Sequence, residues 1–149
     1  MSTYIVTGAA GFIGSNVSDA LLLQGHQVVG VDNLSAAYDV RMKEHRLEKL
    51  LPHPAFTFLK ADITDQAIID QLTQAVPHAQ AVINLAAMAG VRQSMSDPWS
   101  YLYTNTLGTL NMLEYTRRQE VPKFILASTS SLYGADGTQP HSELDPTDR

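Results

Sequence analysis

Short apolar runs and longer amphipathic stretches alternate along the chain. The apolar runs predict buried β-strands at residues 3–7, 27–31, 56–61, 81–85 and 123–127. The stretches between them have apolar residues at helical spacing and predict helices at residues 12–24, 37–51, 65–75 and 97–119, with a loop at residues 86–96. Strands joined by helical crossovers are typical of an α/β protein with a doubly wound parallel sheet. The right-handed crossover rule and a glycine turn after the first strand predict the strand order 3-2-1-4-5.

The faces of the predicted helices follow from their apolar positions. The first helix, which Gly25 ends, is expected to bury Ile13, Val17, Leu21 and one of the neighbours of Leu21. The second carries a strongly polar run at residues 41–49, which we expect to be solvated above a thin apolar stripe. The third is expected to be capped by Asp65. Its apolar residues are expected to face the sheet: Ile68, Ile69 and Leu72.

The strongest chemical signal is T-G-A-A-G-F-I-G-S at residues 7–15, between the first strand and the first helix. This arrangement binds phosphate groups, because a helix start offers unpaired N–H groups and the positive end of the helix dipole. Gly8 allows the tight turn, Gly11 lets backbone approach a pyrophosphate, and Gly14 lets the helix pack closely. The spacing is G-x-x-G-x-x-G, for which a plain βα turn is the alternative. The strand before it and the helix after it favour dinucleotide binding.

Small, polar or acidic residues follow each predicted strand, so they meet at one edge of the sheet, where ligands bind in such folds. Asp32 follows Gly14 by 18 residues. A carboxylate there accepts hydrogen bonds from adenosine ribose hydroxyls and repels a 2′-phosphate, which favours NAD over NADP. The alternative is a turn or helix-capping aspartate. Asp62 either hydrogen-bonds the adenine or caps a turn. The same two alternatives apply to Asn33.

The small residues at 85–89 either leave room for a flat ring or ribose or allow tight sheet packing. Asn105 lies in the middle of the last helix, on one stripe with Tyr101, Gly108 and Met112. Asn105 is expected to tie this helix to backbone beside the site, or to be a satisfied core amide. We expect the other stripe to be core or a subunit interface; it comprises Trp99, Leu102, Tyr103, Leu107, Leu110 and Leu113.

The last predicted strand is followed by four hydroxyl residues at 128–131. Hydroxyls there hydrogen-bond a substrate oxygen without adding charge, or they cap the turn that follows. They cannot run a redox step alone, because such a step needs a general base.

Composition narrows the function classes. A chain of 149 residues with 44% apolar and 17% charged residues is expected to form one soluble domain with a real core. A net charge of −5 without a basic run argues against nucleic acid or an anionic membrane as partner. There is no cysteine, and the five histidines lack metal-ligand spacing, so we expect no metal site. The first strand begins close to Met1, so we expect no signal peptide and a cytoplasmic protein.

Taken together, these residues resemble the extended short-chain dehydrogenase/reductase family, the NAD-dependent nucleotide-sugar epimerases and dehydratases. The matching motifs are T-G-A-A-G-F-I-G at 7–14, V-D-N-L at 31–34, A-D-I-T-D at 61–65, N-L-A-A at 84–87, D-P-W-S-Y-L-Y-T-N-T-L-G-T-L-N-M-L-E at 97–114 and A-S-T-S-S-L-Y-G at 127–134. Y-D-V-R-M-K at 38–43 and G-V-R-Q-S at 90–94 resemble the UDP-glucuronate 4-epimerase branch. The resemblance implies a Rossmann-type sheet and a homodimeric parent enzyme. It also implies C4 epimerisation of UDP-glucuronate to UDP-galacturonate, in which NAD⁺ removes and returns a hydride through a 4-keto intermediate.

The family's site residues map onto this sequence by position. The cofactor-binding set is Gly8, Gly11, Phe12, Ile13, Gly14, Asp32, Asn33, Asp62, Ile63, Leu85, Ala86, Ala87 and Asn105. Substrate binding is assigned to Ala89, Arg92, Ser128 and Ser130, and the catalytic Ser/Thr to Thr129. Arg92 lies near the anionic part of the sugar nucleotide, or it anchors a loop through an ion pair.

One family motif is missing. The family's base is the tyrosine of Y-x-x-x-K, but the residues four positions after the six tyrosines are Gly8, Met42, Asn105, Leu107, Gln119 and Gly137. The stretch S-E-L-D-P-T-D at 142–148 resembles the segment that leads into that motif. We therefore expect an inactive, truncated NAD-binding domain without the catalytic helix or the sugar-nucleotide domain, and with apolar surface exposed at the last strand.

Two alternatives stay open. A dehydratase or decarboxylase parent is the first, although a dehydratase would be expected to have Asp-Glu at the position of Ser130-Ser131. A non-catalytic NAD-binding module is the second.

Overall fold

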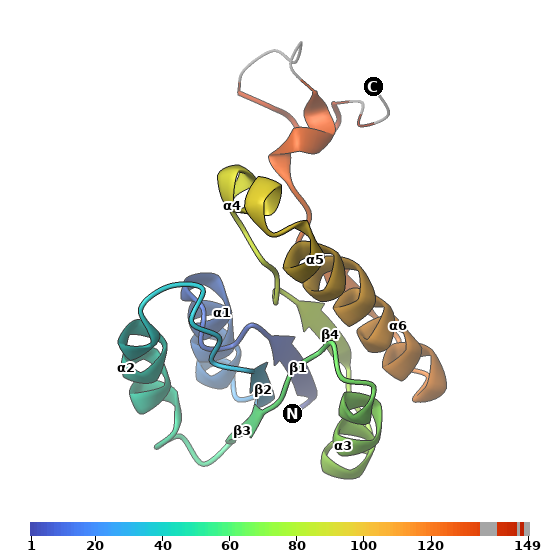
Figure 1. The fold of residues 1–149 in the computed structure, drawn as a ribbon. Helices are drawn as coiled ribbons and strands as arrows, with labels where there is room; N and C mark the ends of the chain where they lie inside the picture. Colours follow the sequence, from blue (N-terminus) through green and yellow to red (C-terminus); the bar gives the residue numbers. More distant parts are fainter. Residues whose placement is uncertain (135–139, 146, 148–149) are drawn as a thin grey trace.

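The computed structural model describes residues 1–134, 140–145 and 147, and shows one sheet between two pairs of helices (Figure 1). The five strands are β1 (Thr3–Thr7), β2 (Gln27–Asp32), β3 (Phe56–Lys60), β4 (Ala81–Asn84) and β5 (Phe124–Leu126). All neighbouring strands are parallel and their order is β3-β2-β1-β4-β5, which confirms the predicted Rossmann-type topology. Among the residues described, no helix is long and apolar enough to cross a membrane.

Each face of the sheet has its own hydrophobic core. Helices α1 (Phe12–Leu23) and α2 (Val40–Leu50) cover one face, where Val6 and Val28 meet Leu47. Helices α3 (Ala67–Ala75) and α6 (Thr109–Arg118) cover the other, where Ile68, Leu72 and Met112 are buried with Ile5 and Val82. The predicted inward face of α3 is confirmed, but its N-cap is Gln66 and not Asp65. Asp65 Oδ1 accepts the Ala67 N–H at 2.9 Å from the turn before the helix. Alternate strand residues thus feed opposite cores, as a sheet covered on both faces requires.

The buried face of α1 is offset from the predicted one. Its inward residues are mostly small: Gly14, Ser15, Ser18 and Leu22. Ile13 is 63% exposed, so the prediction that it is buried is wrong, while Val17 and Leu21 are half-buried. Small residues lie inward because this helix begins directly on the glycine turn, where a large side chain does not fit.

The segment between β4 and β5 contains more helix than predicted. The expected loop includes a short helix, α4 (Val91–Ser96), before α5 (Pro98–Tyr101) begins with Pro98 as predicted. The long helix then continues as a π-helical segment, η1 (Leu102–Gly108), before α6. A π-helix widens the turn, because its hydrogen bonds run from i to i+5, and it often marks a functional region.

Apolar side chains are exposed on η1, α6 and β5. The stripe of the long helix that was expected to be core or a subunit interface is not core at five positions, which are exposed: Trp99, Leu102, Tyr103, Leu110 and Leu113. The subunit interface stays a prediction. β5 pairs only with β4 among the described strands. Ile125 and Leu126 are exposed there, which agrees with the expectation of uncovered apolar surface at this strand.

The buried phenol of Tyr115 should make the fold sensitive to alkaline pH. Its O–H donates to the carbonyl of Val76 at 3.1 Å, and burial raises the pKa of Tyr115 to about 12. The unfolded chain ionises this phenol near pH 10, so its contribution to the free energy of unfolding is complete below pH 10. That contribution is lost between about pH 10 and 12, at about 1.4 kcal/mol per pH unit.

Urea unfolding of the wild type and of Tyr115→Phe measures this contribution. At about pH 8 the variant should be about 1 kcal/mol less stable, because it lacks the hydrogen bond. The difference should vanish at about pH 10.7 and reverse by about pH 11.5, since phenylalanine does not ionise. An unchanged difference across this range would contradict the assignment.

Candidate functional site

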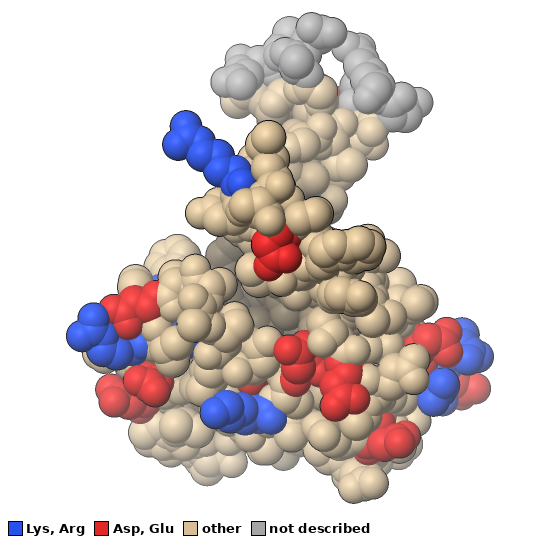
Figure 2. All heavy atoms as spheres, in the orientation of Figure 1, with Lys and Arg blue, Asp and Glu red and all other residues tan. Residues whose placement is uncertain are grey.

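A cleft of about 440 Å³ lies at the carboxyl ends of β1, β2, β3 and β4. Figure 2 shows the molecule hollowed near its middle, with mainly uncharged atoms around the hollow. Nine residues of the predicted site line this cleft: Gly8, Gly11, Asp32, Asn33, Asp62, Ile63, Leu85, Ala86 and Ala87. Residues from four strand ends therefore come together, as the parallel topology predicts.

The glycine turn after β1 has no room for side chains. Gly8 has φ +66°, and a Cβ atom there would lie 2.9 Å from the backbone N of Ala86. Gly11 donates its N–H to the Gly8 carbonyl at 2.9 Å, and a Cβ on Gly14 would overlap that same oxygen. The first N–H groups of α1, which have no partner within a helix, follow directly. The turn is therefore a close-packed backbone cradle at a helix start.

Thr7 holds this turn to the end of β4. Its buried hydroxyl donates to Asn84 Oδ1 at 2.7 Å. Thr7 Oγ1 also accepts the N–H groups of Leu85 and Ala86, each at 3.0 Å. Asn84 in turn donates to Thr109 Oγ1 at 3.1 Å, which extends the connection to α6. The sequence analysis gave Thr7 no role, because one threonine at a strand end carries no distinctive signal.

The carboxylate of Asp32 is buried in the cleft wall and hydrogen-bonded on both oxygens. Oδ2 accepts the N–H of Ala10 at 3.1 Å, and Oδ1 accepts the N–H of Leu34 at 2.8 Å. Oδ1 also pairs with Lys43 Nζ at 3.2 Å. Asp32 therefore performs the turn function that was the alternative to ribose binding, at a position that still lines the cleft.

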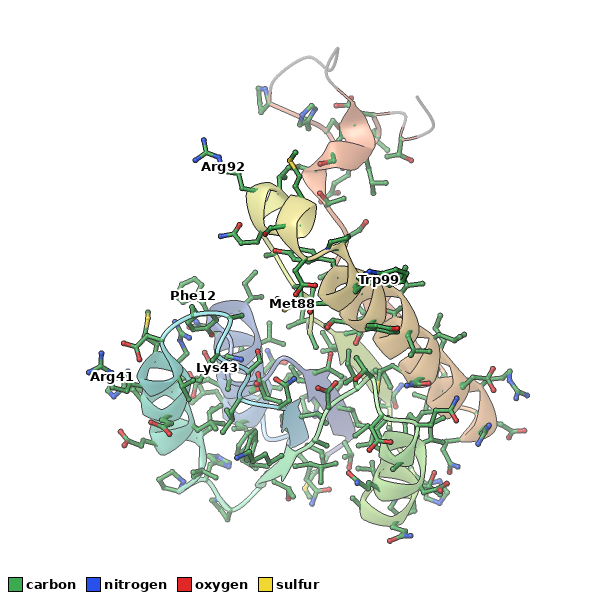
Figure 3. All side chains as sticks on the ribbon, in the orientation of Figure 1. Phe12, Arg41, Lys43, Met88, Arg92 and Trp99 are labelled. Carbon is green, nitrogen blue, oxygen red and sulfur yellow. The ribbon has the colours of Figure 1, made fainter. Side chains whose placement is uncertain are left out.

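Lys43 is the main residue of this site that the sequence analysis missed. Its side chain is 7% exposed, so it is not part of a solvated face as expected for the polar run of α2. Figure 3 shows Lys43 pointing from α2 toward the strand ends, whereas Arg41 points outward. The signal was present in the spacing, since Lys43 lies four and seven residues before the buried Leu47 and Leu50.

Asn33 and Asp62 meet across the ends of β2 and β3. Asn33 Nδ2 donates to Asp62 Oδ2 at 2.8 Å. The other carboxylate oxygen accepts the N–H and the hydroxyl of Thr64, at 2.8 and 2.7 Å. Partial burial opposes ionisation of Asp62, but the hydrogen bonds from Asn33 and Thr64 outweigh it, so the pKa of Asp62 lies below its usual value. This wall of the cleft therefore presents an ionised carboxylate near neutral pH.

The backbone after β4 is fixed by side chains of the long helix. Asn105 Oδ1 accepts the N–H of Met88 at 2.8 Å, and its Nδ2 donates to the Met88 carbonyl at 3.0 Å. The hydroxyl of Tyr101 lies 2.8 Å from the Ala89 carbonyl and 2.9 Å from that of Gly90. Asn105 is exposed, so it is not a core amide, and the predicted tie to backbone beside the site is confirmed.

The remaining predicted residues do not line the cleft. Phe12, Ile13 and Gly14 follow it on α1, and Ala89 is tied to Tyr101. Arg92 is exposed and points outward from α4 (Figure 3), and the structure shows no ion pair between it and any described residue.

The hydroxyl residues after β5 are exposed. Thr129 accepts the N–H of Ser131 at 3.2 Å and thereby caps the short 3₁₀-helix η2 (Ser130–Tyr133). This is the capping function that was the alternative to a catalytic one. The assigned roles of Ser128, Thr129 and Ser130 towards a substrate stay predictions.

Removal of the Thr7 hydroxyl should destabilise the protein strongly. Thr7→Val keeps the side-chain shape but leaves Asn84 Oδ1 and two backbone N–H groups without a partner. We expect the free energy of unfolding in urea to fall by about 2–4 kcal/mol. Thr7→Ser keeps the hydroxyl and should cost only about 1 kcal/mol, for the lost methyl group. Equal losses in the two variants would show that the hydroxyl is unimportant.

Asn105 should control local opening of the backbone after β4. In Asn105→Ala the amide hydrogen of Met88 loses its acceptor, so its native-state exchange should become about tenfold faster. Asn105→Asp keeps an acceptor for this amide but loses the donor to the Met88 carbonyl, so its exchange should lie between those of the wild type and the alanine variant. If exchange at Met88 is the same in the alanine variant and the wild type, the tie does not hold this segment.

Comparisons with known proteins agree with this geometry. Residues 4–149 match the model of the NAD dependent epimerase/dehydratase family. A UDP-glucuronate 4-epimerase of Thermodesulfobacterium geofontis is 45% identical over 144 residues, which are 97% of this chain and 44% of that protein. A probable UDP-glucuronate 4-epimerase of Rhizobium meliloti is 40% identical over 145 residues, 97% of this chain and 42% of that protein.

Solved structures agree as well. A UDP-glucuronic acid 4-epimerase of Bacillus cereus, in complex with UDP-glucuronic acid and NAD, has a TM-score of 0.83 at 34% identity and covers 97% of this chain and 45% of its own. A UDP-Glc/GlcNAc 4-epimerase of Campylobacter jejuni has a TM-score of 0.84 at 31% identity, over 99% of this chain and 43% of its own.

This chain thus spans less than half the length of these relatives. Both the glycine turn and the acidic residues at the strand ends lie within the matched region, and the match extends to residue 149. The chain belongs to the NAD dependent epimerase/dehydratase family.

Proposed function

We propose that the cleft binds NAD and that this chain is the NAD-binding half of a nucleotide-sugar 4-epimerase whose substrate is UDP-glucuronate. The observation that carries the proposal is the placement of Gly8, Gly11 and Asp32 in one cleft, with Gly11 as the N-cap of α1. A dinucleotide needs such a combination, because its diphosphate requires close backbone N–H groups and its adenosine ribose requires an acceptor.

The residues of the cleft fit the parts of NAD. Gly8 and Gly11 line the cleft and carry no side chains, so their backbone would be accessible to the diphosphate just before α1 begins. Asp32 would hold the adenosine ribose, and Asn33 and Asp62 would hold the adenine. The small side chains of residues 85–87 would leave space beside the backbone that Asn105 and Tyr101 fix. NAD⁺ held by these residues would supply a reversible hydride acceptor for sugar C4.

The choice of UDP-glucuronate rests on the relatives. Proteins named UDP-glucuronate 4-epimerase are 45% identical to this chain in one case and 40% in several, and a solved relative at 34% identity binds UDP-glucuronic acid with NAD. In the assigned roles, Thr129 would contact the reacting hydroxyl and Arg92 the anionic part of the substrate. A dehydratase or decarboxylase remains the second candidate, and Ser130-Ser131 in place of Asp-Glu favours the epimerase over a dehydratase.

We further propose that the 149 residues alone do not catalyse the reaction. Their sequence contains no Tyr-x-x-x-Lys, so the general base that the family uses is not among them. Proton transfer and most of the sugar-nucleotide site would then need residues outside this chain. In the proposed parent, a homodimer would cover the exposed apolar side chains of Trp99, Leu102 and Leu110. The cytoplasmic location stays a prediction from the sequence.

Calorimetric titration with NAD⁺ tests the proposed cofactor site. The wild-type chain should bind NAD⁺, and Gly11→Val should bind it about tenfold more weakly or worse, because the added side chain projects where the diphosphate must approach the backbone. Ala67→Val adds bulk at an exposed position away from the cleft and serves as the control. Absence of NAD⁺ binding by a folded wild-type chain would reject the proposal.

The same preparation tests catalysis. UDP-glucuronate incubated with the 149-residue chain and NAD⁺ should yield no UDP-galacturonate. Turnover would contradict the need for an external base, whereas NAD⁺ binding without turnover is the expected result.

A further inference from the structure

Residues 33–39, which connect β2 to α2, form one wall of the cleft and pass beside the start of α1 (Figure 1). The first residue of this segment is fixed to the end of β3, because Asn33 donates to Asp62 at 2.8 Å. The last one, Asp39, is the N-cap of α2. Four residues of the segment line the cleft: Asn33, Ser35, Ala37 and Tyr38. A ligand in the cleft would therefore lie against this segment.

The middle of the segment is held by side chains of α2. Within the part of the chain that the structure describes, no backbone–backbone hydrogen bond joins residues 36–38 to another element. The ring of Tyr38 is 40% exposed and faces two cations of α2. Lys43 Nζ lies 5.3 Å from the ring centroid, and Arg46 Cζ lies 5.8 Å from it. These cation–π contacts and the hydroxyl of Tyr38 fix the segment where backbone contacts do not.

Arg46 connects the segment to the glycine turn. Its Nη1 donates to the hydroxyl of Tyr38 at 3.0 Å and to the carbonyl of Ala10 at 3.3 Å. Its Cζ also lies 5.9 Å from the centroid of the Phe12 ring at the start of α1. Arg46 forms no ion pair with any residue that the structure describes, so its contacts are neutral groups of two cleft walls. One guanidinium group thus joins α2, the 33–39 segment and the turn.

We propose that Arg46 is a positioning residue that holds the 33–39 segment against the glycine turn, and that a dinucleotide enters and leaves the cleft when these contacts open. The part about the dinucleotide rests on the proposed NAD site. All the contacts of Arg46 are with protein groups, so they would be present both before and after the cofactor binds. An epimerase returns the hydride to its substrate and leaves the cofactor unchanged, so a wall that opens slowly suits this reaction.

Stopped-flow binding of NADH, the fluorescent form of the cofactor, tests this role. In Arg46→Met the association and dissociation rate constants should each rise about tenfold, and Kd should stay within about threefold, because the lost contacts favour neither the free nor the bound chain. Tyr38→Phe keeps the ring and every charge but loses the hydroxyl, and should raise both rate constants about threefold. The double variant should be no faster than Arg46→Met, because the two side chains share one contact.

Arg41→Met is the matched control for the loss of an arginine from α2. Arg41 pairs with Asp39 on the exposed side of this helix and makes none of the contacts of Arg46. Both rate constants should stay within about twofold of the wild type. Unchanged rates in Arg46→Met would overturn the proposal. A change in only one rate constant, with an equal change in Kd, would also overturn it, because Arg46 would then act on the cofactor directly.

Cleavage by chymotrypsin after residue 38 tests the opening of the segment in the absence of cofactor. Cleavage of the folded chain at this position should be about tenfold faster in Arg46→Met than in the wild type, because the open segment is more populated. Tyr115→Phe lowers the stability of the whole fold away from the segment and should not change this rate. If Arg46→Met does not fold by circular dichroism, Tyr38→Phe serves in both tests, since chymotrypsin also cleaves after phenylalanine.

The two experiments separate this inference from the proposed function. Equal cleavage of the wild type and the variants overturns the positioning role of Arg46. Faster cleavage of Arg46→Met in a chain that does not bind NADH supports the positioning of the segment and rejects the proposed cofactor site. Binding of NADH with the same rates in all chains supports the cofactor site and overturns the role of Arg46 in cofactor exchange.

Discussion

The hydroxyl of Thr7 is the contact on which the cleft depends. It lies at the end of β1, and it hydrogen-bonds Asn84 and the first two backbone N–H groups after β4. The glycine turn also begins at Thr7, so one side chain fixes two cleft walls relative to each other. The contact works only because Gly8 lacks a side chain, since a Cβ there would meet the Ala86 backbone. Buried polar groups of this kind are costly unless fully bonded, and here they are bonded before any ligand arrives.

The other buried or partly buried carboxylates of the cleft are also hydrogen-bonded within the protein. Asp32 is satisfied by two backbone N–H groups and Lys43, and Asp62 by Asn33 and Thr64. The polar groups are thus pre-organised by local turns, which lowers the entropy that a ligand must remove on binding. A ligand then meets carboxylates whose orientation is already set, and it competes with protein donors only where the carboxylate has no spare lone pair.

The sequence predicted the topology and most of the cleft, because both follow from local periodicity and from the rule that parallel strands end at one edge. It failed where tertiary packing overrides local pattern. Ile13 is apolar but exposed, since the helix start must pack small residues against the glycine turn. Lys43 is charged but buried, since its partner Asp32 lies on another element. The helix α4 was missed because its six residues lie between glycine and aspartate without a marked apolar face.

The π-helical segment η1 constrains the number of residues in this part of the chain as strongly as it constrains their identity. Before and within it, Tyr101 and Asn105 face the backbone after β4; beyond it, Met112 and Tyr115 face the core. Loss of one residue between these pairs would rotate one of them by about 100° about the helix axis. Insertions and deletions should therefore be rare between residues 101 and 112 among related proteins, even where individual side chains vary.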